Sequence, residues 1–197
     1  MENKTIIDLG ACKGDDSYFY LLKGFDVMAV EANPNLCEEM LKIYKKFIDA
    51  KRLKIINRAI HSQNDCTLDF YINSFEEWSS LDNKSKATTE NSFVTKQIQT
   101  ISLDKIIEQV ENELYYIKID IEGGELTAIT SLKQSEKLPK YLSFEVNPDK
   151  DAILDTLIEL GYNEFKIIRQ GVDHLRNTNN QREGNIVDFK FRNCHSG

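Results

Sequence analysis

The stretch TIIDLGACKGDDSYFYLLKGFDVMAVE, residues 5–31, decides the fold. Its first five residues read as a short buried strand, which Gly10 and Gly14 then break. A helix is expected over residues 17–23 and a second strand over residues 26–31. Three residues could cap that helix: Asp15, Asp16 and Ser17. A strand, a helix and a second strand in this order are typical of a parallel sheet with right-handed crossovers.

The rest of the chain continues this alternation, with one interruption. Further core strands are expected over residues 53–60, 114–122 and 141–147. Helices are expected over residues 34–47, 102–110, 125–132 and 149–160, and a final antiparallel pair of strands over 164–170 and 185–192. Residues 61–100 break the pattern with two strand-like segments and a long polar loop at roughly 74–95. We therefore expect one α/β domain over residues 1–197, with residues 61–100 inserted between core strands three and four.

Composition narrows the classes of partner. The formal net charge is -7, which disfavours non-specific binding to nucleic acid or to an anionic membrane. The four cysteines lie far apart and no pair has metal-ligand or redox-motif spacing, as expected of free thiols in a reducing compartment. No apolar run approaches the ~20 residues of a membrane span, and no signal peptide is visible. We expect a cytoplasmic protein.

The glycines of the first turn do not form a phosphate-binding loop. Gly10 and Gly14 lack the lysine and hydroxyl residue of a nucleoside triphosphate site, and the turn has one glycine too few for a dinucleotide fingerprint. Asp15 and Asp16 would repel a phosphate at the start of the helix. The turn therefore fits a ligand with a positive centre better than a polyanion.

Glu31 ends the second expected strand, which places it beside the first turn in a doubly wound sheet. A carboxylate at this position can accept both ribose hydroxyls of an adenosine. An adenosine with a cationic, amino-acid-like tail is S-adenosylmethionine. In this interpretation the turn contributes four further residues: backbone contacts from Gly10 and Ala11, close approach at Gly14, and Asp8 to orient the loop or reach the ammonium group. Ser17 either meets the methionine carboxylate or caps the helix.

Charged residues alternate along the fourth expected strand. Lys118, Asp120 and Glu122 would point to one face, opposite an isoleucine at each intervening position. A central strand covered by helices should be apolar on both faces, so these charges need a reason. One reason is an internal ion pair between Lys118 and a carboxylate. The functional interpretation places Asp120 at the methyl-transfer centre, near the methionine ammonium group of the cofactor or the acceptor hydroxyl, with Lys118 and Glu122 in support.

Glu145 ends the neighbouring strand and is expected to lie close to Asp120. Either carboxylate could accept a proton from the hydroxyl group of a substrate. These two residues and Asn147 could also converge on one divalent cation, although we assign no metal site.

Six segments together resemble the FkbM family of S-adenosylmethionine-dependent methyltransferases: IDLGACKGD, AVEANP, NRAI, TISLDKII, YIKIDIEGGEL and SFEVN. The resemblance runs from about residue 5 to 147. It implies a Rossmann-like class I methyltransferase fold, whose seven-stranded, mostly parallel sheet has an antiparallel last strand and helices on both faces. It also implies methyl transfer, most often to a hydroxyl oxygen, with a small molecule or carbohydrate as substrate. By the same resemblance Ala32 and Ala59 line the cofactor pocket and Arg58 flanks it.

Two other functions share parts of this pattern. A nicotinamide-dependent oxidoreductase would have the same fold and the ribose-binding Glu31, but the missing glycine and the acidic helix start argue against it. A non-catalytic Rossmann-like binding module would keep the fold without turnover. The buried charges of the fourth strand argue against this module, because they would have no function to offset their burial.

Overall fold

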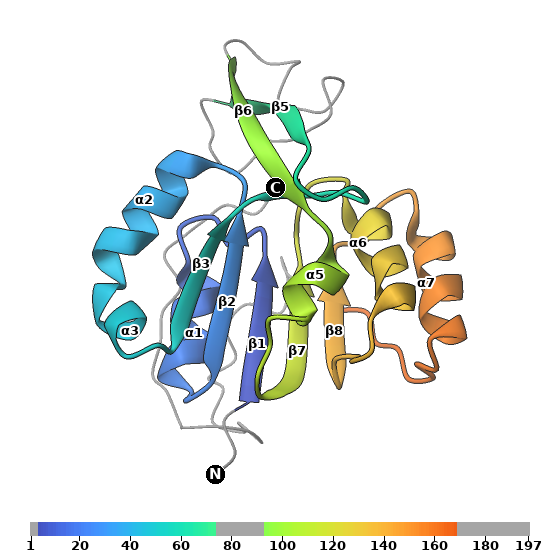
Figure 1. Cartoon of the computed structure of the whole chain (residues 1–197). Coiled ribbons are helices and arrows are strands. Elements are labelled where there is room, and N and C mark those ends of the chain that lie inside the picture. The colour runs from blue at the N-terminus through green and yellow to red at the C-terminus, as the bar shows by residue number, and fades with distance from the viewer. Residues whose placement is uncertain (1–3, 74–92, 169–197) are drawn as a thin grey trace.

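The computed structural model of the chain describes residues 4–73 and 93–168. Its main sheet has five parallel strands in the order β3-β2-β1-β7-β8 (Figure 1). Their bounds are β1 (Lys4–Leu9), β2 (Asp26–Glu31), β3 (Leu53–Asn57), β7 (Glu113–Ile119) and β8 (Tyr141–Phe144). The strand order reverses between β1 and β7, and ligands of such sheets bind at the carboxyl ends of the strands beside this point. The expected α/β class with a parallel sheet is confirmed.

Helices cover both faces of the sheet, as expected (Figure 1). One face carries α1 (Asp15–Leu22), α2 (Pro34–Ile43) and α3 (Lys45–Asp49). The other carries α5 (Leu103–Ile107), α6 (Glu125–Ser131), the short 3-10 helix η2 (Leu132–Gln134) and α7 (Lys150–Glu159). The helix expected over residues 34–47 is interrupted at Tyr44, which separates α2 from α3.

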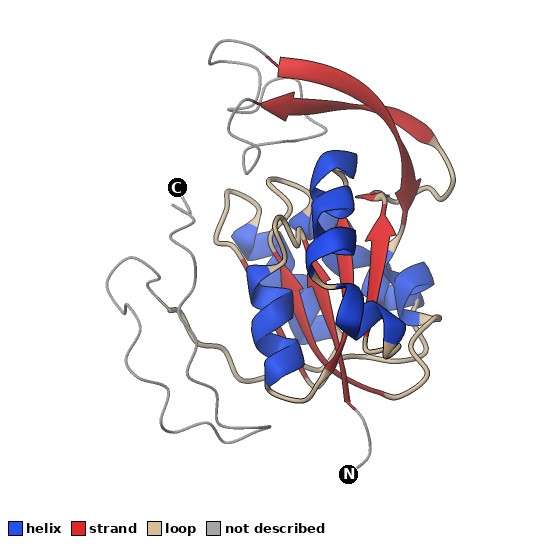
Figure 2. Ribbon diagram, turned by 90° about the vertical axis from the view of Figure 1, so that its left-hand side faces the viewer, coloured by secondary structure: helices blue, strands red, loops and turns tan. Residues whose placement is uncertain are grey.

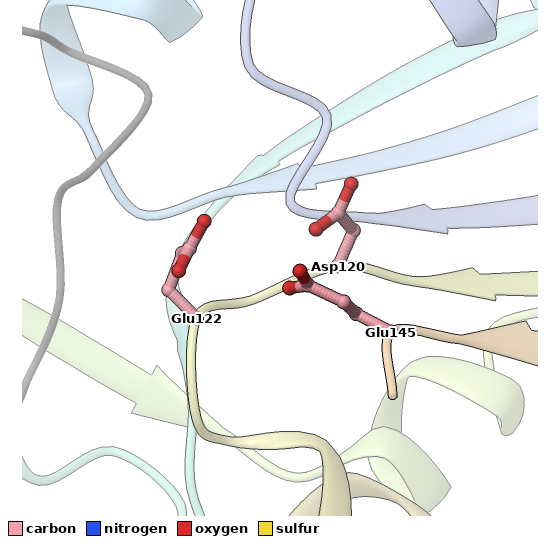
Figure 3. Close-up of side chains that lie close together, drawn as sticks. All are labelled: Asp120, Glu122 and Glu145. Carbon is pink, nitrogen blue, oxygen red and sulfur yellow. The ribbon is translucent and has the colours of Figure 1, made fainter. Parts of the chain in front are cut away.

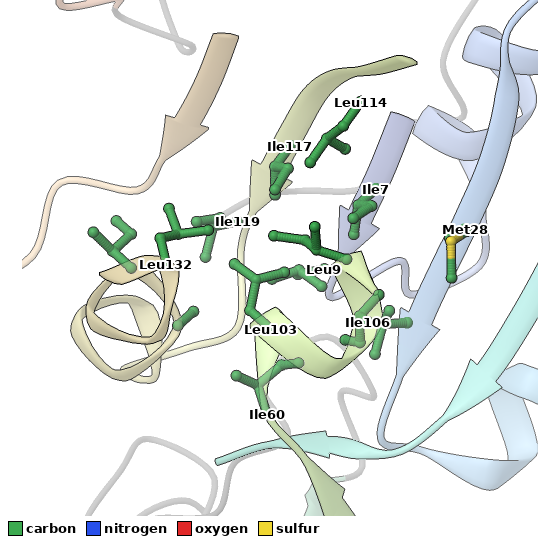
Figure 4. Close-up of a cluster of buried hydrophobic side chains, with 14 of the residues drawn as sticks. Ile7, Leu9, Met28, Ile60, Leu103, Ile106, Leu114, Ile117, Ile119 and Leu132 are labelled. Carbon is green, nitrogen blue, oxygen red and sulfur yellow. The ribbon is translucent and has the colours of Figure 1, made fainter. Parts of the chain in front are cut away.

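The two faces of the sheet bury different side chains because neighbouring residues of a strand point in opposite directions. Ile7 and Leu9 of β1 and Ile117 and Ile119 of β7 join the larger apolar cluster, under α5, α6 and α7 (Figure 4). The intervening residues face α1, where Asp8 of β1 is buried. The polar residues between β1, β7 and α1 thus lie on the side of the sheet opposite the main core.

A second, three-stranded sheet lies at the carboxyl edge of the main sheet (Figures 1 and 2). It contains β4 (Ala59–Ile60), β5 (Thr67–Asn73) and β6 (Phe93–Ile101), in the order β4-β6-β5. The antiparallel pair of β5 and β6 confirms the two strand-like segments of the insertion. Most of the expected polar loop, residues 74–92, lies outside the described residues. The strand expected over residues 53–60 is broken at Arg58, because its last two residues pair with β6 instead of continuing β3.

The expected final pair of strands is not seen in the part of the chain that the structure describes. Residues 162–168 form neither helix nor strand, and Ile167 is 84 % exposed. The predicted partner, residues 185–192, lies outside the described ranges. The main sheet therefore has five described strands rather than seven, and the antiparallel last strand stays a prediction.

Candidate cofactor-binding and catalytic site

The turn between β1 and α1 lies against the end of β7. Gly10 has a φ of +77°, and a Cβ atom placed on it would lie 1.7 Å from the backbone oxygen of Asp120. Only glycine fits so close to another backbone. The N–H groups of Gly10 and Ala11 both donate to the Val30 oxygen, at 2.9 and 3.1 Å. The backbone contacts expected from these two residues to a cofactor would therefore have to come from their carbonyl oxygens, and the Ala11 oxygen already accepts the Gly14 N–H at 2.8 Å.

Gly14 packs closely against α2 and Tyr44. Its φ is +79°, and an added Cβ would lie 2.7 Å from the ring of Tyr44 and 2.9 Å from the sulfur of Met40. The space beside it is thus filled by α2 and the residue that follows that helix. Gly14 is also the N-cap residue of α1, so the three expected capping residues lie inside the helix.

Glu31 joins the first turn to the start of α2. Its Oε2 accepts the Cys12 N–H at 2.9 Å and its Oε1 accepts the Asn33 N–H at 2.7 Å. Burial raises the pKa of Glu31 to about 7, although the two N–H groups oppose this shift. Each carboxylate oxygen can accept a second hydrogen bond. The carboxylate therefore retains the acceptors that the hydroxyls of a ribose would need.

Asp8 is wholly buried beneath α1. The Ser17 hydroxyl donates to its Oδ2 at 2.6 Å, and the Lys118 Nζ lies 3.8 Å from its Oδ1. Burial raises the pKa of Asp8, while Lys118 opposes the shift. Oδ1 has no hydrogen-bond partner among the described residues. Ser17, which is equally buried, thus orients Asp8, and the structure supports neither of the two roles expected for its hydroxyl.

Lys118 holds three carboxylates on the α1 side of the sheet. Its Nζ lies 3.0 Å from Asp16 and 3.1 Å from Asp120, in addition to its contact with Asp8. Burial alone would lower the pKa of Lys118, but the three acids raise it above its ordinary value. Lys118 therefore stays protonated and cannot act as a base. The expected internal ion pair is present. Three carboxylates surround one ammonium group, and this excess of negative charge favours a cationic ligand nearby.

The expected alternation of charges on one strand is wrong beyond Lys118. Strand β7 ends at Ile119, so Asp120 and Glu122 lie on the turn that follows it, where Glu122 has a φ of +52°. The break occurs because the backbone turns into α6 here, while the Asp120 N–H still donates to the Leu9 oxygen at 3.0 Å.

Three carboxylates meet beyond the ends of β7 and β8. Oxygens of Asp120, Glu122 and Glu145 all lie within 4.8 Å of one another. Figure 3 shows Glu145 reaching from the end of β8 toward Asp120, with Glu122 on the turn beyond. Asn147 bonds elsewhere: its Nδ2 donates to Glu125 and its Oδ1 accepts the Asp149 N–H. Two of the three residues named for a divalent cation, Asp120 and Glu145, thus lie close together, and the cation itself stays a prediction.

The hairpin of β5 and β6 packs against two residues expected to line the cofactor pocket. Ala59 is buried and clusters with Phe70, Ile72 and Ile98 of the hairpin, with Ala32 packed against them. Arg58 lies between β3 and β4 and is half-exposed. The structure thus brings Ala32 and Ala59 together, with Arg58 beside them in the chain.

Two residues of the site were not singled out from the sequence. Asn57 donates from Nδ2 to the backbone oxygens of Glu31 and Ala32, both at 2.9 Å, and so fixes the end of β2. Glu125 is 1 % exposed and accepts backbone N–H groups of the preceding turn. The sequence signals for these two residues are weak. Asn57 is an asparagine at the end of an apolar strand, and Glu125 is an acid directly after Gly124 at the start of a helix.

The residues present fit S-adenosylmethionine. Glu31 offers hydrogen-bond acceptors for ribose hydroxyls, and the group of Asp8, Asp16 and Asp120 exceeds the charge of Lys118. A buried, unpartnered Asp8 oxygen adds one further acceptor beside that group. These acceptors and their excess of negative charge suit a cationic ligand better than a polyphosphate.

No helix in the described ranges is both long and apolar enough to cross a membrane.

Comparison with known proteins agrees with this geometry. No curated protein and no solved structure matches the chain. A protein-family model, the methyltransferase FkbM domain, matches residues 8–176, and methyltransferases of this family use S-adenosylmethionine. The match spans most of the chain, from Asp8 at the end of β1 past α7. The chain therefore belongs to the FkbM family of methyltransferases.

Proposed function

We propose that the protein transfers the methyl group of S-adenosylmethionine to a hydroxyl oxygen of a small molecule or carbohydrate. One observation carries the proposal: the carboxylates of Asp120, Glu122 and Glu145 lie close together. They lie beside the expected cofactor-binding turn, whose Gly10 packs against the backbone of Asp120. A carboxylate at hydrogen-bond distance from a hydroxyl can take its proton as the oxygen is methylated. Methylation of a tertiary amine or a thiolate would need no such acceptor.

The proposed roles follow from the contacts of each residue. When bound, S-adenosylmethionine supplies a methyl group activated on its sulfonium. Glu31 holds the ribose, and the carbonyl oxygens of the first turn together with Asp8 face the cationic tail. Lys118 fixes Asp120 at 3.1 Å, so Asp120 is held in one orientation. We assign acceptance of the proton to Asp120 or Glu145, with Glu122 in support.

The partners and compartment proposed for the protein rest on charge and cysteine placement. A net charge of -7 disfavours nucleic acid and anionic membrane as partners. A small-molecule or carbohydrate acceptor is what the resemblance to the FkbM family implies. Within the described ranges Cys12, Cys37 and Cys66 form no disulfide, as is usual in the cytoplasm. We propose that the protein acts there.

The direct test combines binding with transfer. Calorimetry should show S-adenosylhomocysteine binding with a Kd in the micromolar range or tighter. Labelled cofactor should transfer its methyl group to members of a panel of alcohols, sugars and phenols, with the product identified as a methyl ether by mass spectrometry. Asp120→Asn and Glu145→Gln should each keep the binding and reduce the transfer, and the larger loss identifies the proton acceptor.

Asp16→Asn is the matched control. Asp16 contacts the same Lys118 at 3.0 Å, so this variant loses a comparable ion pair without losing a member of the carboxylate group. Equal loss of transfer in Asp16→Asn and Asp120→Asn would show that the ion pairs, rather than Asp120 itself, matter. Binding of NADH in place of S-adenosylhomocysteine would instead support the oxidoreductase. A gain of stability in Asp120→Asn with no wild-type transfer to lose would support the non-catalytic module.

A further inference from the structure

Glu125, the first residue of α6, is an acid buried against the main core. It is 1 % exposed, and its neighbours Ala128 and Ile129 on α6 belong to the larger apolar cluster. A carboxylate at this depth is destabilising unless hydrogen bonds satisfy it. Four hydrogen bonds from three donors do so. Oε1 accepts from the N–H groups of Ile121 and Gly123, both at 3.3 Å, and Oε2 accepts from Gly123 at 3.1 Å and from Asn147 Nδ2 at 2.8 Å.

These bonds join two segments that are distant in the chain. Ile121 and Gly123 flank Glu122 on the turn after β7, where Glu122 has the left-handed φ of +52° that non-glycine residues rarely adopt. Asn147 follows Glu145 on the segment after β8. One side chain therefore holds the turn that carries two of the clustered carboxylates and is bonded to the segment that carries the third.

Asn147 is fixed at both ends of its amide. Nδ2 donates to Glu125, and Oδ1 accepts the Asp149 N–H at 2.9 Å. It cannot turn its amide over without losing both bonds. Asn147 is half-buried, unlike Glu125, so it can be substituted without opening the main core.

We propose that Glu125 and Asn147 are positioning residues, whose hydrogen bond sets the spacing of Asp120 and Glu122 from Glu145. The inference rests on the proposed function, because it gives this spacing a purpose in methyl transfer. Neither residue is a member of the carboxylate group (Figure 3). They act through the two turns that present it, and a small displacement of reacting groups can cost about 100-fold in rate.

The test exploits the direction of the hydrogen bond. Glu125→Gln replaces one acceptor oxygen by an amide NH2, which faces a donor in either orientation: the Asn147 N–H or the N–H groups of the turn. Asn147→Asp sets two carboxylates together. The double variant Glu125→Gln with Asn147→Asp restores one donor and one acceptor, with the same total charge. We expect kcat to fall about 100-fold in each single variant and to recover in the double variant. The KM for S-adenosylmethionine should stay unchanged, because Glu31 and the first turn are untouched.

A matched control lies at the opposite end of the sheet. Asn112 Nδ2 donates to Asp26 Oδ2 at 3.2 Å, which joins the residue before β7 to the start of β2. Asn112→Asp creates the same pair of carboxylates there and should leave kcat at its wild-type value. Should Glu125→Gln not fold, Asn147→Ala breaks the same bond at a half-buried position and replaces it in the comparison.

Crystal structures of the variants give a readout that does not depend on activity. The oxygens of Asp120 and Glu145, within 4.8 Å in the wild type, should separate beyond that distance in the single variants and return within it in the double variant. Unchanged spacing in the single variants would overturn the inference, whether or not the wild type transfers methyl groups. Wild-type kcat in both single variants would overturn it while leaving the proposed function intact.

Discussion

Glu31 combines an almost complete loss of solvent contact with a place at the end of a strand, beside the first turn. Burial raises its pKa from about 4.5 to about 7. An acid with a raised pKa binds its proton more tightly in the folded protein than in the unfolded chain. The free energy of unfolding should therefore fall by ~3 kcal/mol as the pH rises from about 4.5 to about 7, and should be level above that range.

Urea denaturation of the wild type and Glu31→Gln across this range measures the effect. The variant cannot ionise at this position, so the difference between the two curves should follow the titration. The affinity for S-adenosylhomocysteine should rise through pH 7 in the wild type alone, because the ionised carboxylate is the better acceptor for ribose hydroxyls. Parallel stability curves for the two proteins would contradict the burial argument.

Lys118 is the second residue whose substitution has a defined consequence. Lys118→Met leaves the wholly buried Asp8 without its cation, and breaking such a pair costs ~3–5 kcal/mol. Adding Asp8→Asn to Lys118→Met should recover part of this loss, because the orphaned carboxylate is removed while Ser17 keeps an acceptor. A double-mutant cycle measured by urea denaturation at pH 7 gives the coupling. Additive losses would show that Asp8 and Lys118 stabilise the fold independently.

At the scale of elements, the two glycines of the β1–α1 turn differ in what surrounds them. Gly10→Ala directs a methyl group at the backbone carbonyl of Asp120, which cannot move aside as a flexible side chain can. The loss in the free energy of unfolding should therefore exceed the ~1–2 kcal/mol that a left-handed φ alone costs. Gly14→Ala meets the side chains of Tyr44 and Met40, and methionine can adapt its rotamer. Urea denaturation should therefore rank Gly10→Ala as the more destabilising. The opposite rank would mean that the ends of β1 and β7 separate readily.

Elements built from consecutive residues were predictable, and those that depend on distant contacts were not. The β1–turn–α1–β2 unit and the placement of Glu31 follow from local apolar runs and glycine positions. The break at Arg58 depends on β6, some forty residues later, which captures Ala59 and Ile60. Strand β7 likewise ends at Ile119, before a turn whose N–H groups donate to Glu125, and no local pattern reveals these contacts.

At the scale of the whole molecule, a bound nucleoside should stabilise the fold. A ligand at 100 times its Kd adds ~2.7 kcal/mol to the free energy of unfolding when it binds only the folded state. We expect S-adenosylhomocysteine to raise the Tm accordingly in a calorimetric scan, and NADH at the same concentration to leave it unchanged. Equal shifts from both ligands would show a site that does not distinguish a sulfur-linked tail from a dinucleotide.

Strand β1 lies between β2, which follows it closely in the chain, and β7, which begins only at Glu113. On the ribosome, β1, β2 and β3 can therefore associate long before β7 has emerged from the exit tunnel. During that interval one edge of β1, with Ile7 and Leu9, has no neighbouring strand from its own sheet. Nascent chains halted before residue 113 should accordingly be bound by chaperones, and those long enough to release α7, which ends at Glu159 and completes the cover of Ile7 and Leu9, should not.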